Sequence, residues 1–231
     1  MTQWIPLEGN DEVMNEYLSK MGLQDGQVTF AEIFGLDLLD MVPRPVKAVL
    51  LCFPITDQQE EYAAEEAAKI AKDGQNVSPS IFYMHQSIGN ACGTIGILHA
   101  VGNLAPSERL VAPGSWLDGF FSAVKGFDAA QIGAHLEGDT KLEEVHEEAA
   151  SAGQSEVPED LENVNLHFIC FTCVDGCLYE LDGRKKTAIN HGPSSPATVL
   201  EDAIVVIKKF MQRDPDSIRF TMTALCAAES T

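Results

Sequence analysis

Cys92 is the residue in this sequence whose surroundings most favour covalent chemistry. It stands at the start of a predicted helix over residues 92–103, where the positive end of the helix dipole favours a thiolate over a thiol. Gly89, Ala91 and Gly93 lie beside it, and such small side chains let a substrate backbone approach closely. The position also fits an inert buried cysteine, which is the commoner case, so it does not establish a nucleophile by itself.

A second group of candidates lies on a predicted hairpin. Two β-rich runs flank Asp175-Gly176, a dipeptide that strongly favours a two-residue turn. With that turn, Ile169 lies opposite Asp182, and His167 becomes its diagonal neighbour on the same face, with Cα atoms about 7–8 Å apart. A histidine paired with a carboxylate is the base and the orienting group of a catalytic triad.

Each candidate also has an ordinary structural interpretation. His167 fits a capped histidine on a surface strand, and Asp182 followed by Gly183 fits a turn. Gln86 precedes Cys92 at the end of a predicted strand, where its neutral amide could donate to an oxyanion, although a solvent-facing glutamine is commoner. Only the combination predicts catalysis, with Cys92 as nucleophile, His167 as base, Asp182 as orienting group and Gln86 as oxyanion donor.

The cysteines of the predicted hairpin raise the alternative of a zinc site. Cys170 and Cys173 have the Cys-x2-Cys spacing that is common among zinc ligands, and Cys177 follows them closely. However, the sequence holds no second pair of ligands at a matching distance, and Cys170 and Cys173 point to opposite faces of one strand. We therefore predict no metal and no organic cofactor.

The elements that would position these residues follow from periodicity and capping residues. Apolar stripes at helical spacing predict helices over residues 11–21, 92–103 and 196–213, the last capped by Ser195, and capping residues predict helices over residues 57–72, 115–125 and 128–137. Apolar or alternating runs predict strands over residues 46–53, 80–86, 166–174, 177–181 and 218–226. Helices that bracket a largely antiparallel sheet give an α+β fold.

One acidic segment breaks this pattern. Residues 137–162 carry ten acidic residues and one lysine, with Ala, Gly, Ser and Pro between them and no sustained apolar period. We expect a long mobile loop, because loops above about 12–15 residues in a compact domain are usually functional or disordered.

The net charge of the chain indicates which kind of macromolecule it binds. The chain has 231 residues, with 15 Lys and Arg against 35 Asp and Glu, which gives a formal charge of −20. An acidic surface repels phosphate and speeds encounters with a basic protein, so we expect a basic partner and no nucleic acid. No run approaches the ~20 apolar residues of a membrane span, and the N-terminus shows no secretory leader. We expect a soluble protein of the cytoplasm, with the nucleus as a second compartment.

The segments around the four candidates resemble the ubiquitin C-terminal hydrolases. They are residues 86–94 (QSIGNACGT), 166–168 (LHF) and 181–184 (LDGR). Further segments similar to that family lie at residues 4–8, 42–45, 190–192 and 208–211, so the resemblance runs essentially from end to end.

The resemblance implies a papain-like α-β-α sandwich with a central, mostly antiparallel sheet and a knotted backbone. It implies one catalytic domain over residues 1–231, with a crossover loop at about 137–163 above the active site. It assigns Gln86 to the oxyanion hole, Cys92 as nucleophile, His167 as general base and acid, and Asp182 as orienter.

The same resemblance implies a substrate. Short members act on ubiquitin, and some on its neddylation relative, releasing small adducts from the C-terminal glycine. We expect these two modifiers as partners, no membrane, and a monomer. Two alternatives stay open, namely a papain-like hydrolase of unrelated peptides and a ubiquitin-binding module with a silent site.

Overall fold

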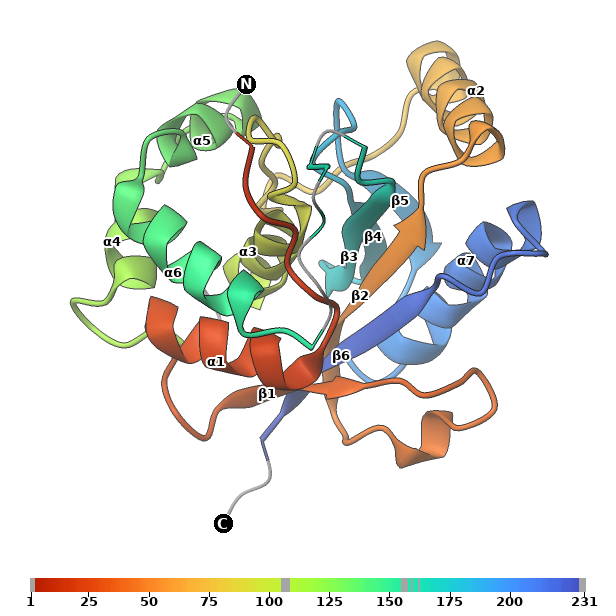
Figure 1. The fold of residues 1–231 in the computed structure, drawn as a ribbon. Coiled ribbons are helices and arrows are strands. Elements are labelled where there is room, and N and C mark those ends of the chain that lie inside the picture. The colour runs from red at the N-terminus through yellow and green to blue at the C-terminus, as the bar shows by residue number, and fades with distance from the viewer. Residues whose placement is uncertain (1–2, 105–108, 155–157, 159, 162, 229–231) are drawn as a thin grey trace.

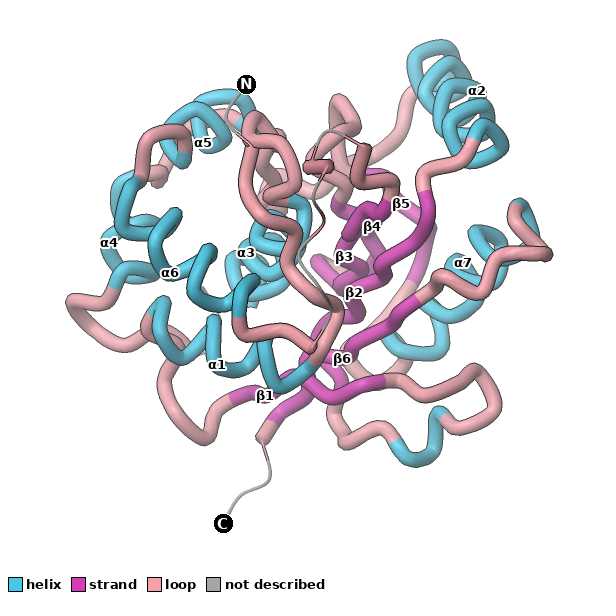
Figure 2. Tube along the Cα trace, viewed as in Figure 1, coloured by secondary structure: helices cyan, strands magenta, loops and turns pink. Residues whose placement is uncertain are grey.

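The structure is a computed structural model that describes residues 3–104, 109–154, 158, 160–161 and 163–228. Its strands are β1 (Val28–Glu32), β2 (Val46–Pro54), β3 (Leu166–Val174), β4 (Cys177–Leu181), β5 (Ile189–Pro193) and β6 (Thr221–Ala227). They form one sheet in the order β1-β6-β2-β3-β4-β5, in which every neighbouring pair is antiparallel (Figures 1 and 2).

Helices cover both faces of this sheet. They are α1 (Asp11–Met21), α2 (Asp57–Asp73), α3 (Cys92–Leu104), α4 (Trp116–Ala123), α5 (Ala129–Leu136), α6 (Thr140–Ser151) and α7 (Val199–Arg213), with a short 3-10 helix at Leu39–Met41. In Figure 1, α1 and α3 to α6 lie on one side of the sheet, and α2 and α7 lie on the other. The predicted α+β class and its α-β-α layering are confirmed, while the knot stays a prediction.

The central strand β2 explains why both layers are needed. It pairs with β3 and β6, and its residues from Ala48 onward are buried. Leu50 packs into the core beneath α3, whereas Leu51 packs into the core beneath α7. A strand covered on both faces needs apolar residues at successive positions, which is the pattern in the sequence.

Residues 80–86 do not form the predicted strand, although their pattern is apolar. The N–H of Phe82 donates to the side chain of Asn103 at 2.8 Å. The N–H of Met84 likewise donates to His99 Nε2 at 3.1 Å. Polar side chains of α3 therefore accept two of these backbone N–H groups, and those of His85 and Gln86 donate to the carbonyls of Ala129 and Gly183, so the segment needs no neighbour in the sheet.

The acidic segment is also more ordered than predicted. It contains α6, whose N-cap Asp139 accepts a hydrogen bond from the N–H of Leu142 at 3.0 Å. Leu142, His146 and Ala149 form the buried stripe of α6. This stripe combines a leucine with a histidine and an alanine, which is why apolar periodicity did not reveal it. Residues 155–157, 159 and 162 of the segment lie outside the described residues.

Two predicted boundaries near the C-terminus are wrong. Helix α7 begins after Thr198 rather than at residue 196, because the Ser195 and Thr198 hydroxyls bond to each other (2.9 Å) in the turn that precedes it. Strand β6 begins at Thr221, and Ile218 is 96% exposed instead of half-buried.

Candidate active site

The turn before α3 fixes the position of Cys92. Asn90 adopts a left-handed backbone conformation (φ 59°), which redirects the chain into the helix. Its side-chain amide donates to the carbonyl oxygens of Trp4 (3.1 Å) and Leu161 (2.9 Å). The turn therefore ties the N-terminal segment and the segment after α6 to the first residue of α3, which is Cys92.

The hairpin brings His167 and Asp182 together as predicted. Val174 pairs with Cys177 across a two-residue turn, and this register continues along both strands. His167 Nε2 lies 2.6 Å from Asp182 Oδ1, and both side chains are buried. The ring of His167 also lies close enough to the side chain of Cys92 to lower the pKa of that thiol. The structure thus places thiol, imidazole and carboxylate beside one another.

These contacts, and not burial, decide the charge states. Burial raises the pKa of Cys92, but His167 and the N–H groups of Phe168 and Gly93 lower it to below its usual value. Burial lowers the pKa of His167, but Asp182 and Cys92 together raise it to about 10. Burial raises the pKa of Asp182, but the charge of His167 lowers it to about 2. The contacts around Cys92 and His167 therefore favour a thiolate beside an imidazolium.

Three other thiols, those of Cys52, Cys170 and Cys226, lack this activation. All six cysteines are free. Burial raises the pKa of Cys52, Cys170 and Cys226, and no comparable histidine contact offsets it. A thiolate is the nucleophilic form of cysteine, so Cys92 is the favoured nucleophile among these thiols.

Gln86 reaches the same region through its backbone. Its N–H donates to the carbonyl of Gly183 at 2.9 Å, next to Asp182. Its side-chain nitrogen donates to the carbonyl of Ile88 at 3.1 Å, and the second proton of that nitrogen is left for another acceptor. A Cβ on Gly183 would lie 3.0 Å from the Cβ of Gln86, so a larger residue there would push Gln86 away by a few tenths of an ångström.

Cys92 opens onto a cavity of about 430 Å³. The N-terminal segment lines one side with residues 5–10, and Pro158, Val164 and Leu166 line another. Among the described residues, no three His, Cys, Asp or Glu side chains gather closely enough to hold a metal ion. No helix in the described part of the chain is long and apolar enough to cross a membrane.

Two residues of the site were not singled out from the sequence. Asn90 sets the turn before Cys92, and Gly89-Asn90 is a turn dipeptide that could have revealed it. Tyr83 donates its hydroxyl to the carbonyl of Asp182 at 2.6 Å, and nothing local in the sequence predicts that contact.

Comparison with known proteins decides the family. Residues 4–212 match the model of the family described as ubiquitin carboxyl-terminal hydrolase, family 1. The chain belongs to the ubiquitin carboxyl-terminal hydrolases. It is 44% identical to ubiquitin carboxyl-terminal hydrolase 3 of Arabidopsis thaliana, over 96% of this chain and 94% of that protein. It is 40% identical to the human isozyme L1, over 96% and 98% of the two chains.

The fold of this hydrolase also matches a solved structure. The catalytic domain of Trichinella spiralis UCH37, determined bound to ubiquitin vinyl methyl ester, superposes with a TM-score of 0.75. The match covers 97% of this chain and 96% of that one, at 22% sequence identity. Family membership makes the chain a deubiquitinating cysteine peptidase, and its residues 92, 167 and 182 supply a thiol, an imidazole and a carboxylate.

Proposed function

We propose that this chain hydrolyses the bond between the C-terminal glycine of ubiquitin and a small adduct, with Cys92, His167 and Asp182 as its triad. The observation that carries the proposal is the buried hydrogen bond between His167 and Asp182, beside a Cys92 thiol whose pKa His167 lowers. A silent binding module would have no reason to place a thiol of lowered pKa beside a charged imidazole.

The chemistry is acyl transfer in two stages. The Cys92 thiolate attacks the glycine carbonyl, while Gln86 and a backbone N–H donate to the oxyanion. His167 gives its proton to the leaving amine, which departs and leaves a thioester on Cys92. His167 then takes a proton from water, the hydroxide attacks the thioester, and the thiolate is released with the ubiquitin carboxylate. Asp182 keeps its hydrogen bond to His167 throughout.

The surroundings of Cys92 support a preference for small adducts. The cavity has walls from residues 5–10 on one side and from Pro158, Val164 and Leu166 on the other. Asn90 bonds to the carbonyl oxygens of Trp4, which precedes the first wall in the chain, and Leu161, which lies between Pro158 and Val164, so the segments that carry the walls are linked across the turn before Cys92. A folded leaving group has to pass between them, whereas a short amine or an unfolded peptide fits more easily.

A fluorogenic ubiquitin C-terminal substrate tests the activity. We expect turnover with that substrate and labelling of Cys92 by a ubiquitin electrophile. The same assay with the corresponding substrate of the neddylation modifier shows which of the two modifiers is turned over faster. The Cys92→Ala variant should bind ubiquitin and turn nothing over. Cleavage of a free peptide at a similar rate would support a general papain-like peptidase instead, and a native protein without turnover would contradict the proposal.

A change in chain length tests the preference for small adducts. Inserting about 10–15 Gly and Ser residues after Gln154 widens the passage at a modest entropic cost, since doubling a loop costs only about 0.6 kcal/mol. Diubiquitin cleavage should rise while turnover of the small substrate stays within a few-fold of native. A native enzyme that cuts diubiquitin as fast as the small substrate would remove the size preference and leave the triad proposal intact.

A further inference from the structure

The carboxylate of Asp182 stands on a tight turn whose own hydrogen bonds define its direction. The N–H of Lys185 donates to the carbonyl of Asp182 at 2.9 Å. The N–H of Arg184 donates to Asp182 Oδ1 at 2.9 Å, the same oxygen that faces His167. A shift of this turn would therefore move the carboxylate relative to the imidazole.

A single hydroxyl outside the turn contacts both of its ends. Tyr83 Oη lies 2.6 Å from the carbonyl oxygen of Asp182 and 2.6 Å from that of Lys185. Burial, followed by the charges of Asp182 and Glu180, raises the pKa of Tyr83, so its hydroxyl stays protonated and donates. One proton shared between two carbonyls holds them at a fixed separation.

The ring of Tyr83 is itself held in place from α3. It stacks on the ring of His99 with centroids 5.3 Å apart and an interplanar angle of 8°. His99 Nε2 in turn lies 3.1 Å from the backbone nitrogen of Met84, the residue after Tyr83. The phenol therefore links the helix that carries Cys92 to the turn that carries Asp182.

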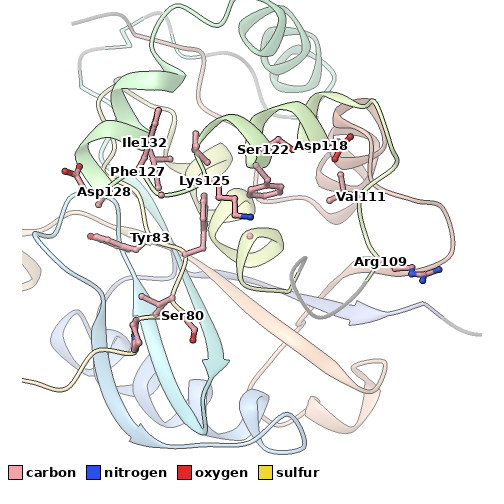
Figure 3. A pocket seen from close by; sticks show the side chains of 18 of the residues that line it. Ser80, Tyr83, Arg109, Val111, Asp118, Ser122, Lys125, Phe127, Asp128 and Ile132 are labelled. Carbon is pink, nitrogen blue, oxygen red and sulfur yellow. The ribbon is translucent and has the colours of Figure 1, made fainter.

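Tyr83 also lies at the wall of a separate cavity. That cavity has a volume of about 1290 Å³ and is lined by α4, α5 and residues 79–83. In Figure 3 the hydroxyl of Tyr83 is turned away from Lys125, which lies across the cavity. The oxygen is thus directed toward the Asp182 turn and not toward solvent in the cavity.

We propose that Tyr83 is a positioning residue, whose hydroxyl clamps the Asp182–Lys185 turn and so keeps the Asp182 carboxylate against His167. The inference rests on the proposed function, because it concerns the same triad. Tyr83 does not touch the thiol or the substrate carbonyl, so its effect on rate passes through Asp182.

The charges around the pair define what a loosened clamp would change. Cys92 and Asp182 are the titratable groups that face His167. Asp182 is faced by His167 and by Lys185, whose ammonium pairs with Glu66 (2.7 Å) and Glu180 (2.5 Å). Because Asp182 raises the pKa of His167, a longer contact between them lowers the pH at which His167 loses its proton.

Tyr83→Phe is the decisive variant, since it removes the hydroxyl and keeps the ring. We expect kcat on the fluorogenic ubiquitin substrate to fall about three- to tenfold with KM unchanged, as for a small misplacement of a catalytic group. The alkaline limb of the kcat profile should move to lower pH by about half a unit. In a protein that already carries Asp182→Asn, adding Tyr83→Phe should lower kcat much less than it does in the native enzyme, because both changes act on the contact between Asp182 and His167.

Tyr179→Phe is the matched control. Tyr179 is also buried, and its hydroxyl accepts the N–H of Ser78 at 2.9 Å without touching the Asp182 turn. Both variants lose a buried hydrogen bond, so both should lower the Tm, but only Tyr83→Phe should move the alkaline limb. Equal pH profiles for the two variants and the native enzyme would overturn the inference. A native enzyme without turnover would instead overturn the proposed function.

Discussion

Two buried histidines in this hydrolase respond to burial in opposite ways. His167, at the open end of the β3–β4 hairpin, has its pKa raised to about 10 although burial works against the charged form. His146, between α6 and the N-terminal segment, has its pKa lowered to about 4, chiefly by burial. Both side chains are almost completely inaccessible to water.

The difference comes from the groups that face each ring. His167 faces a carboxylate and a thiol, and both stabilise an imidazolium. His146 faces only neutral groups, the Thr94 hydroxyl at 2.8 Å and the Ile5 carbonyl at 2.6 Å, and the Thr94 hydroxyl bonds in turn to Tyr17. The first region is arranged for proton transfer, and the second joins α1, α3, α6 and the N-terminus.

Removing the catalytic histidine should give the largest effect. In His167→Ala the thiol loses the partner that lowers its pKa, and the leaving amine loses its proton donor. We expect kcat to fall by about 10²–10⁴-fold on the fluorogenic ubiquitin substrate. His146→Ala serves as the control, with kcat within a few-fold of native. A similar loss of kcat in both variants would break the distinction between the two histidines.

Neutralising the carboxylate should give the next largest effect. Asp182→Asn keeps the shape of the side chain but removes the charge that raises the pKa of His167. We expect kcat to fall by orders of magnitude, although by less than in His167→Ala, with little change in KM. The alkaline limb should move from about pH 10 toward lower pH. A loss below about threefold would show that the pair is not catalytic.

Acid should weaken the fold through the neutral histidines. His99 and His146 have pKa values of about 4 in the folded chain, below the ordinary value of 6.5. The unfolded chain therefore binds more protons between pH 6.5 and 4, and the free energy of unfolding falls across that window by up to roughly 3 kcal/mol per histidine. Denaturant unfolding at a series of pH values measures this slope. Glu180 and Asp182 have pKa values of about 2 in the folded chain, so the stability that their charges provide is lost only as the pH falls further, toward 2.

Removing His146 should give the smallest change. His146→Ala removes the buried hydrogen bonds that His146 makes to the Thr94 hydroxyl and the Ile5 carbonyl, so we expect a loss of about 1–3 kcal/mol in the free energy of unfolding. The slope between pH 6.5 and 4 should become shallower as well. The exposed His135 provides a control, since His135→Ala should change stability by less than about 0.5 kcal/mol. An unchanged pH slope in His146→Ala would show that His146 does not carry the acid effect.

The part of the site that follows local rules was predictable from the sequence. Asp175-Gly176 set a two-residue turn, and that turn fixed the register that brings His167 beside Asp182. The capping residue Asn10 likewise set the start of α1. Turn and cap chemistry act between residues that are neighbours in the chain, so the sequence alone contains them.

Longer-range partners decided the rest. Residues 80–86 have a strand-like pattern, but side chains of α3 take up their backbone donors and turn them into the support for Gln86 and Tyr83. The stripe of α6 is visible only once the contacts of His146 are known. The charge of His167 was likewise settled by contact with Cys92 and Asp182, because burial favours the neutral form and only neighbouring charges reverse that preference.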